Sequence, residues 1–268
     1  MFRGFQITSL KKEDIVSFHK GVCSQIETQE LLKIGRELFK DYKDTLNQDL
    51  LASLKTEDGM IDGEQLESFG FPKFDAEVFI SHSHADTELA TLLAGRLKRD
   101  LDITSFVDSN VWEYRDRLIE MLARFSNCDS TKDGGMAIAA HVDCMLNKAI
   151  VQMMDDCECL FFLNTPNSVT FSSISKSQTL SPWLASELAI YSVIRKKSHD
   201  AKPKMLVANN QYSNASGLKM TYDLRFDNVF KLDAENLFKW IKSASTRCSR
   251  SYKALSELYE LSMYKEVK

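Results

Sequence analysis

The chain has 268 residues, of which 44% are hydrophobic and 27% are charged, a composition typical of a globular protein that is large enough to bury a sizeable core. The formal net charge of −4 argues against a general attraction to nucleic acid or to an anionic membrane, and no apolar run approaches the length of a membrane span. The six cysteines lack the spacing of a disulfide framework or a zinc site, and the amino terminus lacks a signal-peptide pattern, so we expect a cytoplasmic protein.

Two helices are expected over residues 10–56, because this stretch contains little Pro or Gly and carries one apolar stripe at helical spacing. The stripe consists of Leu31, Ile34, Leu38, Tyr42 and Leu46. A hinge is expected at 69–72, where Gly and Pro interrupt the pattern. We therefore place an N-terminal helical region at 1–72.

A turn is expected between these helices and the hinge. Asp58, Asp62 and Gly63 superficially resemble part of a calcium-binding loop. Met60 stands at a ligand position, however, and no acid falls at the twelfth position of such a loop. The sequence favours a plain turn.

Beyond the hinge, short apolar runs alternate with helix-length segments, which is typical of a parallel sheet covered by helices on both faces. The predicted strands are 78–81, 103–108, 159–163, 205–208 and 229–232. The predicted helices include a leucine stripe over 89–97, a segment through Phe125, a segment near 136–154, a helix that starts at Ser181, and 234–246. We therefore expect one α/β domain over 73–246, followed by a C-terminal helix over 247–268 that packs within the chain.

Polar side chains follow the ends of these predicted strands. In parallel α/β sheets the ligand crevice lies beyond the carboxyl ends of the strands. Residues 81–83, Asp108 and Asn164 stand at such ends, and Glu187 lies just past one. The topology therefore predicts that these side chains converge.

The helix that starts at Ser181 places an acid on an apolar face. Ser181 suits the N-cap and Pro182 the first helical position. Trp183 and Glu187 are four residues apart, on a face that Ile190 and Ile194 continue. Burial there would raise the pKa of Glu187, as acid/base catalysis often requires. The alternative is an amphipathic helix whose Glu lies at the edge of the buried stripe.

Several of these segments, in this order and spacing, resemble the Toll/interleukin-1 receptor (TIR) domain family, particularly its bacterial members. They are Val78–Ser81 followed by Asp86, 105–108, 149–163, and the run Ser181-x-Trp183-x-x-x-Glu187-Leu188. The resemblance covers about residues 75–245 and implies a flavodoxin-like fold. Many TIR domains hydrolyse or cyclise NAD+, with a catalytic Glu at the position that Glu187 matches.

The resemblance also implies substrate-binding residues, each with a structural alternative. The implied residues are Ser81, His82, Ser83, Asp108, Trp183 and Arg115. Alternatively, Ser83 or Asp86 caps the next helix, Asp108 caps a turn, and Trp183 packs in the core. Arg115 lies in an apparent insertion over 109–135, in the loop that gates the pocket in the family, and would meet a phosphate or form a surface ion pair.

The implied function is that of an NAD+ glycohydrolase or ADP-ribosyl cyclase, with NAD+ as substrate and without a cofactor or metal. Its product would be a cyclic ADP-ribose isomer that a downstream effector senses in anti-phage defence of the Thoeris kind. The implied partners also include a second copy, through the TIR domain or the terminal helices. The serine-rich stretch 168–177 is expected to be a loop beside the crevice.

Three other functions fit parts of the sequence. A non-catalytic TIR adaptor that acts by self-association or TIR–TIR binding would explain the altered gating loop. A nucleoside deoxyribosyltransferase-like enzyme would share the architecture and a catalytic Glu. The run His82-x-His84-x-Asp86 resembles a metallo-β-lactamase signature, but Thr87 stands where a second His is required and the downstream ligands are missing.

Overall fold

The computed structural model describes residues 1–17, 25–38, 54, 60–71, 73–126, 133–173, 176–194, 221–247 and 251–266. These residues form a five-stranded, all-parallel sheet in the order β3-β2-β4-β1-β8 and a separate three-stranded sheet in the order β5-β6-β7. The predicted α/β class and the five-stranded parallel sheet are therefore confirmed, and the arrangement is consistent with a flavodoxin-like fold.

The strands of the main sheet are β1 (Arg3–Thr8), β2 (Val78–Ser81), β3 (Ser105–Val107), β4 (Cys159–Asn164) and β8 (Val229–Asp233). Four of them lie where strands were predicted, at 78–81, 103–108, 159–163 and 229–232, whereas the predicted strand at 205–208 lies outside the described residues. Both β2 and β3 are buried along their whole length, which explains their continuous apolar runs.

The fifth strand, β1, was not predicted. It lies between β4 and β8 and pairs in parallel with both, so that Gly4 opposes Leu160 on one side and Val229 on the other. The N-terminal helical region placed at 1–72 therefore also contains a strand, because its first residues belong to the sheet. The short segment carries Gly and Gln, and its burial depends on neighbours that are distant in the sequence rather than on its own pattern.

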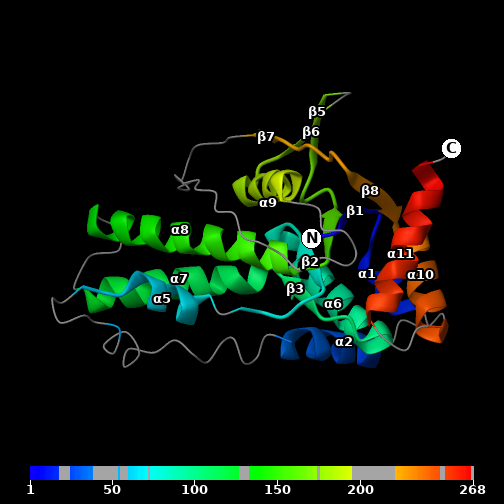
Figure 1. Ribbon diagram of the computed structural model, residues 1–268, viewed down its shortest axis with the longest axis horizontal. Coiled ribbons are helices and arrows are strands. Elements are labelled where there is room, and N and C mark those ends of the chain that lie inside the picture. The colour runs from blue at the N-terminus through cyan, green and yellow to red at the C-terminus, as the bar shows by residue number, and fades with distance from the viewer. Residues whose placement is uncertain are drawn as a thin grey trace.

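The described helices are α1 (Lys12–Ser17), α2 (Gln25–Glu37), α5 (Gly63–Gly70), α6 (Thr87–Leu101), α7 (Ser109–Phe125), α8 (Asp133–Asp156), α9 (Pro182–Val193), α10 (Ala234–Arg247) and α11 (Ser251–Glu266). Successive residues of a strand point to opposite faces of the sheet. Gly4 lies under the Tyr191 ring of α9, whereas Phe5 stacks on Tyr259 of α11. The helices α9 and α11 therefore cover opposite faces (Figure 1).

The C-terminal helices complete the second face, as predicted. Trp240 of α10 is fully buried, meets Phe161 of β4 edge to face, and donates its ring N–H to the carbonyl oxygen of Ala254. Leu255 and Leu258 of α11 are buried as well. Most of the apolar stripe of the last segment therefore packs within the chain, whereas Leu261 is exposed.

A long helical hairpin extends away from the sheet. Helices α7 and α8 pack along each other, and α5 lies beside them (Figure 1). Lys148 of α8 pairs with Glu67 of α5 at 2.9 Å. Asp62 caps α5 by accepting hydrogen bonds from two backbone N–H groups, whereas Asp58, the other acid of the turn that resembled a calcium loop, lies outside the described residues.

The N-terminal helix α2 packs closely on α6 through two glycines. A Cβ on Gly95 would overlap the carbonyl oxygen of Leu31, and a Cβ on Gly35 would overlap that of Thr91. Leu31 is fully buried, whereas Ile34 and Leu38 are half-buried. The predicted stripe therefore faces the core as far as Leu38, and its last two members lie outside the described residues.

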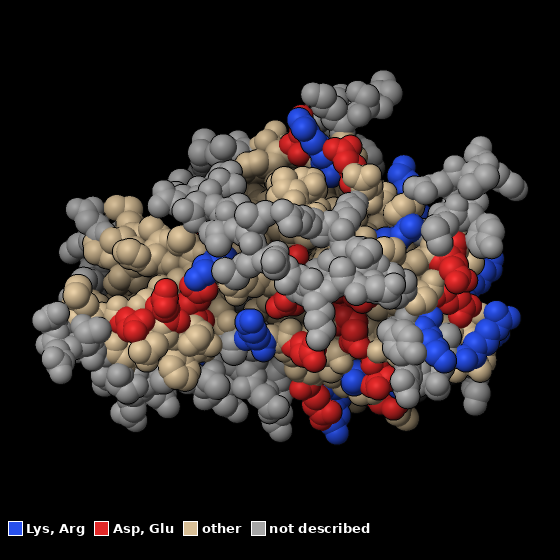
Figure 2. Space-filling model, in the orientation of Figure 1, with Lys and Arg blue, Asp and Glu red and all other residues tan. Residues whose placement is uncertain are grey.

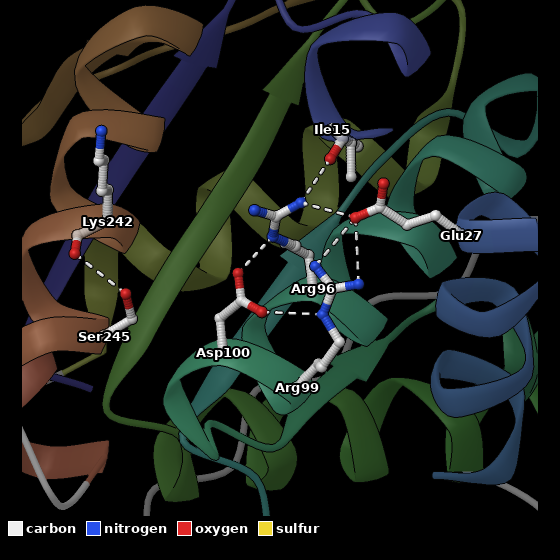
Figure 3. A network of polar contacts seen from close by, with 7 residues as sticks. All are labelled: Ile15, Glu27, Arg96, Arg99, Asp100, Lys242 and Ser245. Carbon is white, nitrogen blue, oxygen red and sulfur yellow. Dashed lines mark hydrogen bonds and ion pairs between the residues drawn. The ribbon is translucent and has the colours of Figure 1, made fainter. Parts of the chain in front are cut away.

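A buried arginine reinforces this contact (Figure 3). Arg96 of α6 is fully buried, donates to the carbonyl oxygen of Ile15 at 2.8 Å, and binds Asp100 at 2.5 Å. Glu27 of α2 accepts from Arg99 at 3.1 Å and lies 3.6 Å from Arg96. Burying a guanidinium is tolerable only when it is paired, so this network also fixes the position of α1 and α2 on α6.

Acidic and basic side chains are interspersed on the face shown in Figure 2, in keeping with the small net charge. Within the described part of the chain, we find no helix that combines the length and the apolar character needed to cross a bilayer.

Candidate functional site

The helix α9 carries the candidate catalytic acid, and its start forms as the sequence predicted. The hydroxyl of Ser181 accepts a hydrogen bond from the backbone N–H of Leu184 at 3.3 Å, and Pro182 is the first helical residue. Glu187 follows at the second turn and is only 1% exposed. It therefore lies inside the protein rather than at the edge of the buried stripe.

Glu187 meets the carboxyl ends of two neighbouring strands. The hydroxyl of Ser81, the last residue of β2, donates to Glu187 Oε2 at 2.5 Å. His82 follows β2, and its Nδ1 lies 2.5 Å from Oδ1 of Asp108, which follows β3. All four side chains are buried, and we call them the carboxyl cluster.

The cluster lies at the carboxyl end of β2, which has β3 on one side and β4 on the other. The chain runs from β2 to β3 and then crosses to β4 on the opposite side. Such a point, at the carboxyl ends of the strands, is the usual ligand crevice of doubly wound sheets. Of the residues predicted to converge, Ser81, His82, Asp108 and Glu187 are therefore brought together. Ser83 and Asn164 were predicted to join them and are not part of the cluster.

The environment changes the protonation of two members of the cluster. Burial raises the pKa of Glu187 well above its ordinary value, the neighbouring charge of Asp108 raises it further, and the hydrogen bond from Ser81 acts in the opposite direction. Burial alone would lower the pKa of His82, but the charge of Asp108 and its hydrogen bond outweigh burial and raise that pKa. Glu187 therefore holds its proton more tightly than an ordinary glutamic acid does.

A proton on Glu187 would give an otherwise unpaired oxygen a hydrogen-bond partner. Glu187 Oε1 has no hydrogen-bond donor among the described residues while both carboxyls are ionised. A proton on Glu187 lets this group donate to Asp108, and two close carboxyls that share one proton form an acid/base pair.

One polar atom of the cluster remains available. His82 Nε2 is buried and has no partner among the residues that the structure describes. A buried polar atom without a partner costs about 1–3 kcal/mol, so a ligand hydroxyl at this position, which can donate or accept, would gain that amount.

A second polar group, which the sequence did not predict, supports the cluster. Asp86 accepts a hydrogen bond from the hydroxyl of Thr165 at 2.5 Å and another from the amide of Asn167 at 2.8 Å. These bonds join the turn after β2 to the loop after β4. Thr165 and Asn167 follow the end of the predicted strand 159–163. The expectation that polar residues after such strand ends lie near the ligand crevice, which identified Asp108, would also have identified them.

The capping roles considered for this turn are not observed. Neither Ser83 nor Asp86 makes a side-chain capping bond. Ser83 is half-buried and precedes a short 3₁₀ turn, His84–Asp86, before α6. Asp108 likewise makes no capping bond at the start of α7.

The remaining two candidates lie outside the cluster. Trp183 is half-buried and packs against the hydrophobic core, as in its structural alternative. Arg115 forms a two-pronged ion pair with Asp143 of α8, with one N–O distance of 3.0 Å, and also binds Asp116. Its guanidinium is therefore engaged by acids of this chain.

The expected serine-rich loop is instead largely a small sheet. The strands β5 (Thr170–Ser173), β6 (Lys176–Thr179) and β7 (Tyr222–Asp223) pair antiparallel beside α9 (Figure 1). The hydroxyl of Thr179 accepts from the N–H of Ser181 and so connects this sheet to the cap of α9.

The run His82-x-His84-x-Asp86 does not form a metal site. His82 binds Asp108, Asp86 binds Thr165 and Asn167, and His84 is exposed. Over the described ranges, no three His, Cys, Asp or Glu side chains are grouped so that they could hold a metal ion.

No protein-family model, curated protein or solved structure matches this chain. Its function is therefore argued from the residues of the carboxyl cluster and from the resemblance of its motifs.

Proposed function

We propose that this protein cleaves the nicotinamide–ribose bond of NAD+, with Glu187 as the catalytic residue. The observation that carries the proposal is the position of Glu187: its buried carboxyl lies at the carboxyl ends of the strands, bonded to Ser81 and beside Asp108. The order of the motifs around it resembles that of NAD+-cleaving TIR domains.

The reaction requires little from the protein. The bond from the ribose carbon to the nicotinamide nitrogen breaks, its electron pair neutralises the cationic ring, and an oxocarbenium-like sugar remains. Water adds to that carbon and releases a proton, giving ADP-ribose, or an adenine nitrogen of the same molecule adds and gives a cyclic isomer. A carboxylate beside the sugar stabilises its developing positive charge, and positioning supplies much of the remaining rate.

Glu187 must be ionised to act as a carboxylate, and its raised pKa opposes this ionisation. A cationic substrate at the site favours the ionised form, because opposite charges lower the pKa of an acid. We infer that the His82–Asp108 pair holds the sugar hydroxyls or receives the proton that Glu187 releases. Activity should therefore rise with pH as Glu187 ionises.

A second function is favoured by the burial of the same residue. Glu187 is 1% exposed and bonded to Ser81, so substrate can reach it only after the surrounding side chains move. A TIR adaptor that acts through self-association would keep such a cluster as a structural element. An enzyme that is activated by assembly would open it.

Nicotinamide release from NAD+ separates these functions. We expect release by the wild-type protein, alone or oligomerised, and a loss of about 10²–10³-fold or more in Glu187→Gln, since the electrostatic stabilisation is removed. Glu120→Gln is the matched control, because Glu120 is exposed on α7. Activity that survives in Glu187→Gln would contradict the assignment of the acid, and a wild-type protein that is silent in both states would favour the adaptor.

The product decides the biological role. Mass spectrometry with chromatographic standards distinguishes ADP-ribose from cyclic isomers. A cyclic isomer would support our proposal of a messenger that a downstream effector senses in anti-phage defence, and ADP-ribose alone would support simple NAD+ depletion.

A further inference from the structure

A cavity of about 520 Å³ lies between the edge strand β8 and the helices α10 and α11. Its lining comes from β1, β8, α10 and α11, and includes Phe5 and Phe230. These two residues oppose each other on neighbouring strands, with ring centroids 6.0 Å apart. The cavity therefore belongs to the α10/α11 face of the sheet, whereas Gly4 faces α9, the helix that carries Glu187.

The floor and the rim of this cavity differ in character. The floor is apolar and largely aromatic, and consists of Phe5, Phe230, Leu232, Trp240 and Leu258. The charged lining residues are Lys231, Lys239, Arg247 and Glu257, which sum to +2. This local positive charge contrasts with the net charge of −4 of the chain.

The basic side chains can reach a bound anion at small cost. Lys239 pairs with Glu235 at 2.6 Å, but both side chains are well exposed, so this pair contributes little. Arg247 lies 3.9 Å from Glu257, whose carboxylate already accepts a hydrogen bond from the hydroxyl of Ser243 at 2.6 Å. Lys231 follows Phe230 on β8, so its side chain points to the opposite face of the sheet and is not counted among the anion-binding residues.

We propose that this cavity is a second binding site, which takes an amphipathic anion: an apolar chain or ring system with one carboxylate, sulfonate or phosphate group. The apolar body lies against Phe230 and Leu258, and the anionic group lies between Lys239 and Arg247. The volume is within the range of sites that enclose most of a small ligand, and such sites are mainly apolar with a few polar groups. The proposal does not depend on the chemistry of the carboxyl cluster.

The test uses dodecanoate as the probe and the uncharged dodecan-1-ol as its control, in competition with the fluorescent anion 8-anilinonaphthalene-1-sulfonate. We expect the fluorescent anion to bind at one site and dodecanoate to displace it at least about tenfold better than dodecan-1-ol, since one charge contact of about 1.4 kcal/mol corresponds to a factor of ten. Equal competition by the acid and the alcohol would overturn the proposal.

Charge reversal locates the site. Lys239→Glu and Arg247→Glu should each weaken dodecanoate binding about tenfold, because an attraction becomes a repulsion. Lys33→Glu is the matched control: Lys33 is an exposed helical lysine that also forms an i,i+4 pair, with Glu37 of α2. Equal affinities of Lys239→Glu and Lys33→Glu, or binding that never saturates at one equivalent, would overturn the proposal.

Discussion

At the scale of single residues, the protein binds protons more tightly when it is folded. The pKa of Glu187 is raised by burial and by Asp108, and the pKa of His82 is raised because Asp108 outweighs burial. An unfolded Glu titrates near about 4.3 and an unfolded His near about 6.5. The stabilisation from each group is therefore complete below these values and is lost as pH rises through the folded pKa.

Replacement of Glu187 by Gln should remove much of this pH dependence. The amide keeps the shape and can accept the hydrogen bond from Ser81, but it does not ionise. Above about pH 5, the free energy of unfolding of the wild type should fall by up to about 1.4 kcal/mol per pH unit more steeply than that of Glu187→Gln. Urea unfolding between pH 5 and 9 measures both slopes. Parallel curves would show that Glu187 is already ionised in the folded protein.

Replacement of Asp108 by Asn should lower the pKa of His82. The variant removes the carboxylate that opposes the effect of burial, so the imidazole loses its proton at a lower pH. An NMR titration of the imidazole resonances measures the change. His84, which is exposed and two residues away, is the internal control and should titrate as before. An unchanged His82 midpoint would mean that Asp108 does not pair with it in solution.

Much of the carboxyl cluster could be predicted from the sequence, for two physical reasons. A cap and an apolar face located Glu187 on its helix, and parallel strands bring Ser81, His82 and Asp108 to one edge of the sheet. The ion pair of Arg115 with Asp143 depends on how α7 and α8 pack. The bonds of Asp86 depend on the path of a loop. The residue spacing within a single segment predicts neither this ion pair nor these hydrogen bonds.

At the scale of elements, the contact between α2 and α6 depends on glycine because their backbones nearly touch. Gly95→Ala would gain up to about 1 kcal/mol of helix propensity, but its methyl group would overlap the carbonyl oxygen of Leu31. Overpacking costs about 1–3 kcal/mol, and backbone atoms cannot rotate away, so we expect a net loss of stability. Chemical denaturation measures it.

Gly63→Ala is the control for this substitution. A Cβ on Gly63, at the start of α5, would meet only the Met145 side chain at 3.7 Å, an ordinary contact. Its stability should change by less than about 0.5 kcal/mol or rise slightly. If Gly95→Ala were equally harmless, α2 would have to lie farther from α6 than it does here.

The sequence predicted helices better than short strands at this scale. Apolar stripes with 3.6-residue spacing located α6, α8, α10 and α11. The serine-rich segment that forms β5 and β6 carries little apolar alternation, because β6 is supported by pairing with β7, 43 and 45 positions later in the chain. The pattern of residues within one segment does not predict pairing with a strand as distant in the sequence as β7.

At the scale of the whole molecule, the main sheet requires the first residues of the chain. Because β1 pairs with both β4 and β8, a protein that begins at residue 73 would lack the strand that joins them. We expect a truncated protein of residues 73–268 to show no cooperative unfolding transition. The full chain should unfold in a cooperative transition followed by circular dichroism. A cooperative transition of the truncated protein would show that the sheet closes without β1.

The overall class was predictable because hydrophobic alternation with helix-length spacers leaves few architectures. The position of β1 was not, since a short strand buried on both faces has no pattern that distinguishes it from other short apolar segments. Strand order is a property of the assembled sheet, and it emerges only from contacts between distant segments.

The central position of β1 has a consequence for synthesis. Its partners begin at Cys159 and Val229, so at ~5–20 residues per second the ribosome delivers the first partner roughly 8–30 s after β1 itself. During that interval an apolar strand with both edges open is exposed to other nascent chains. The main sheet can form only late in translation, and production of this protein in cells should therefore benefit from chaperones that shield its first residues.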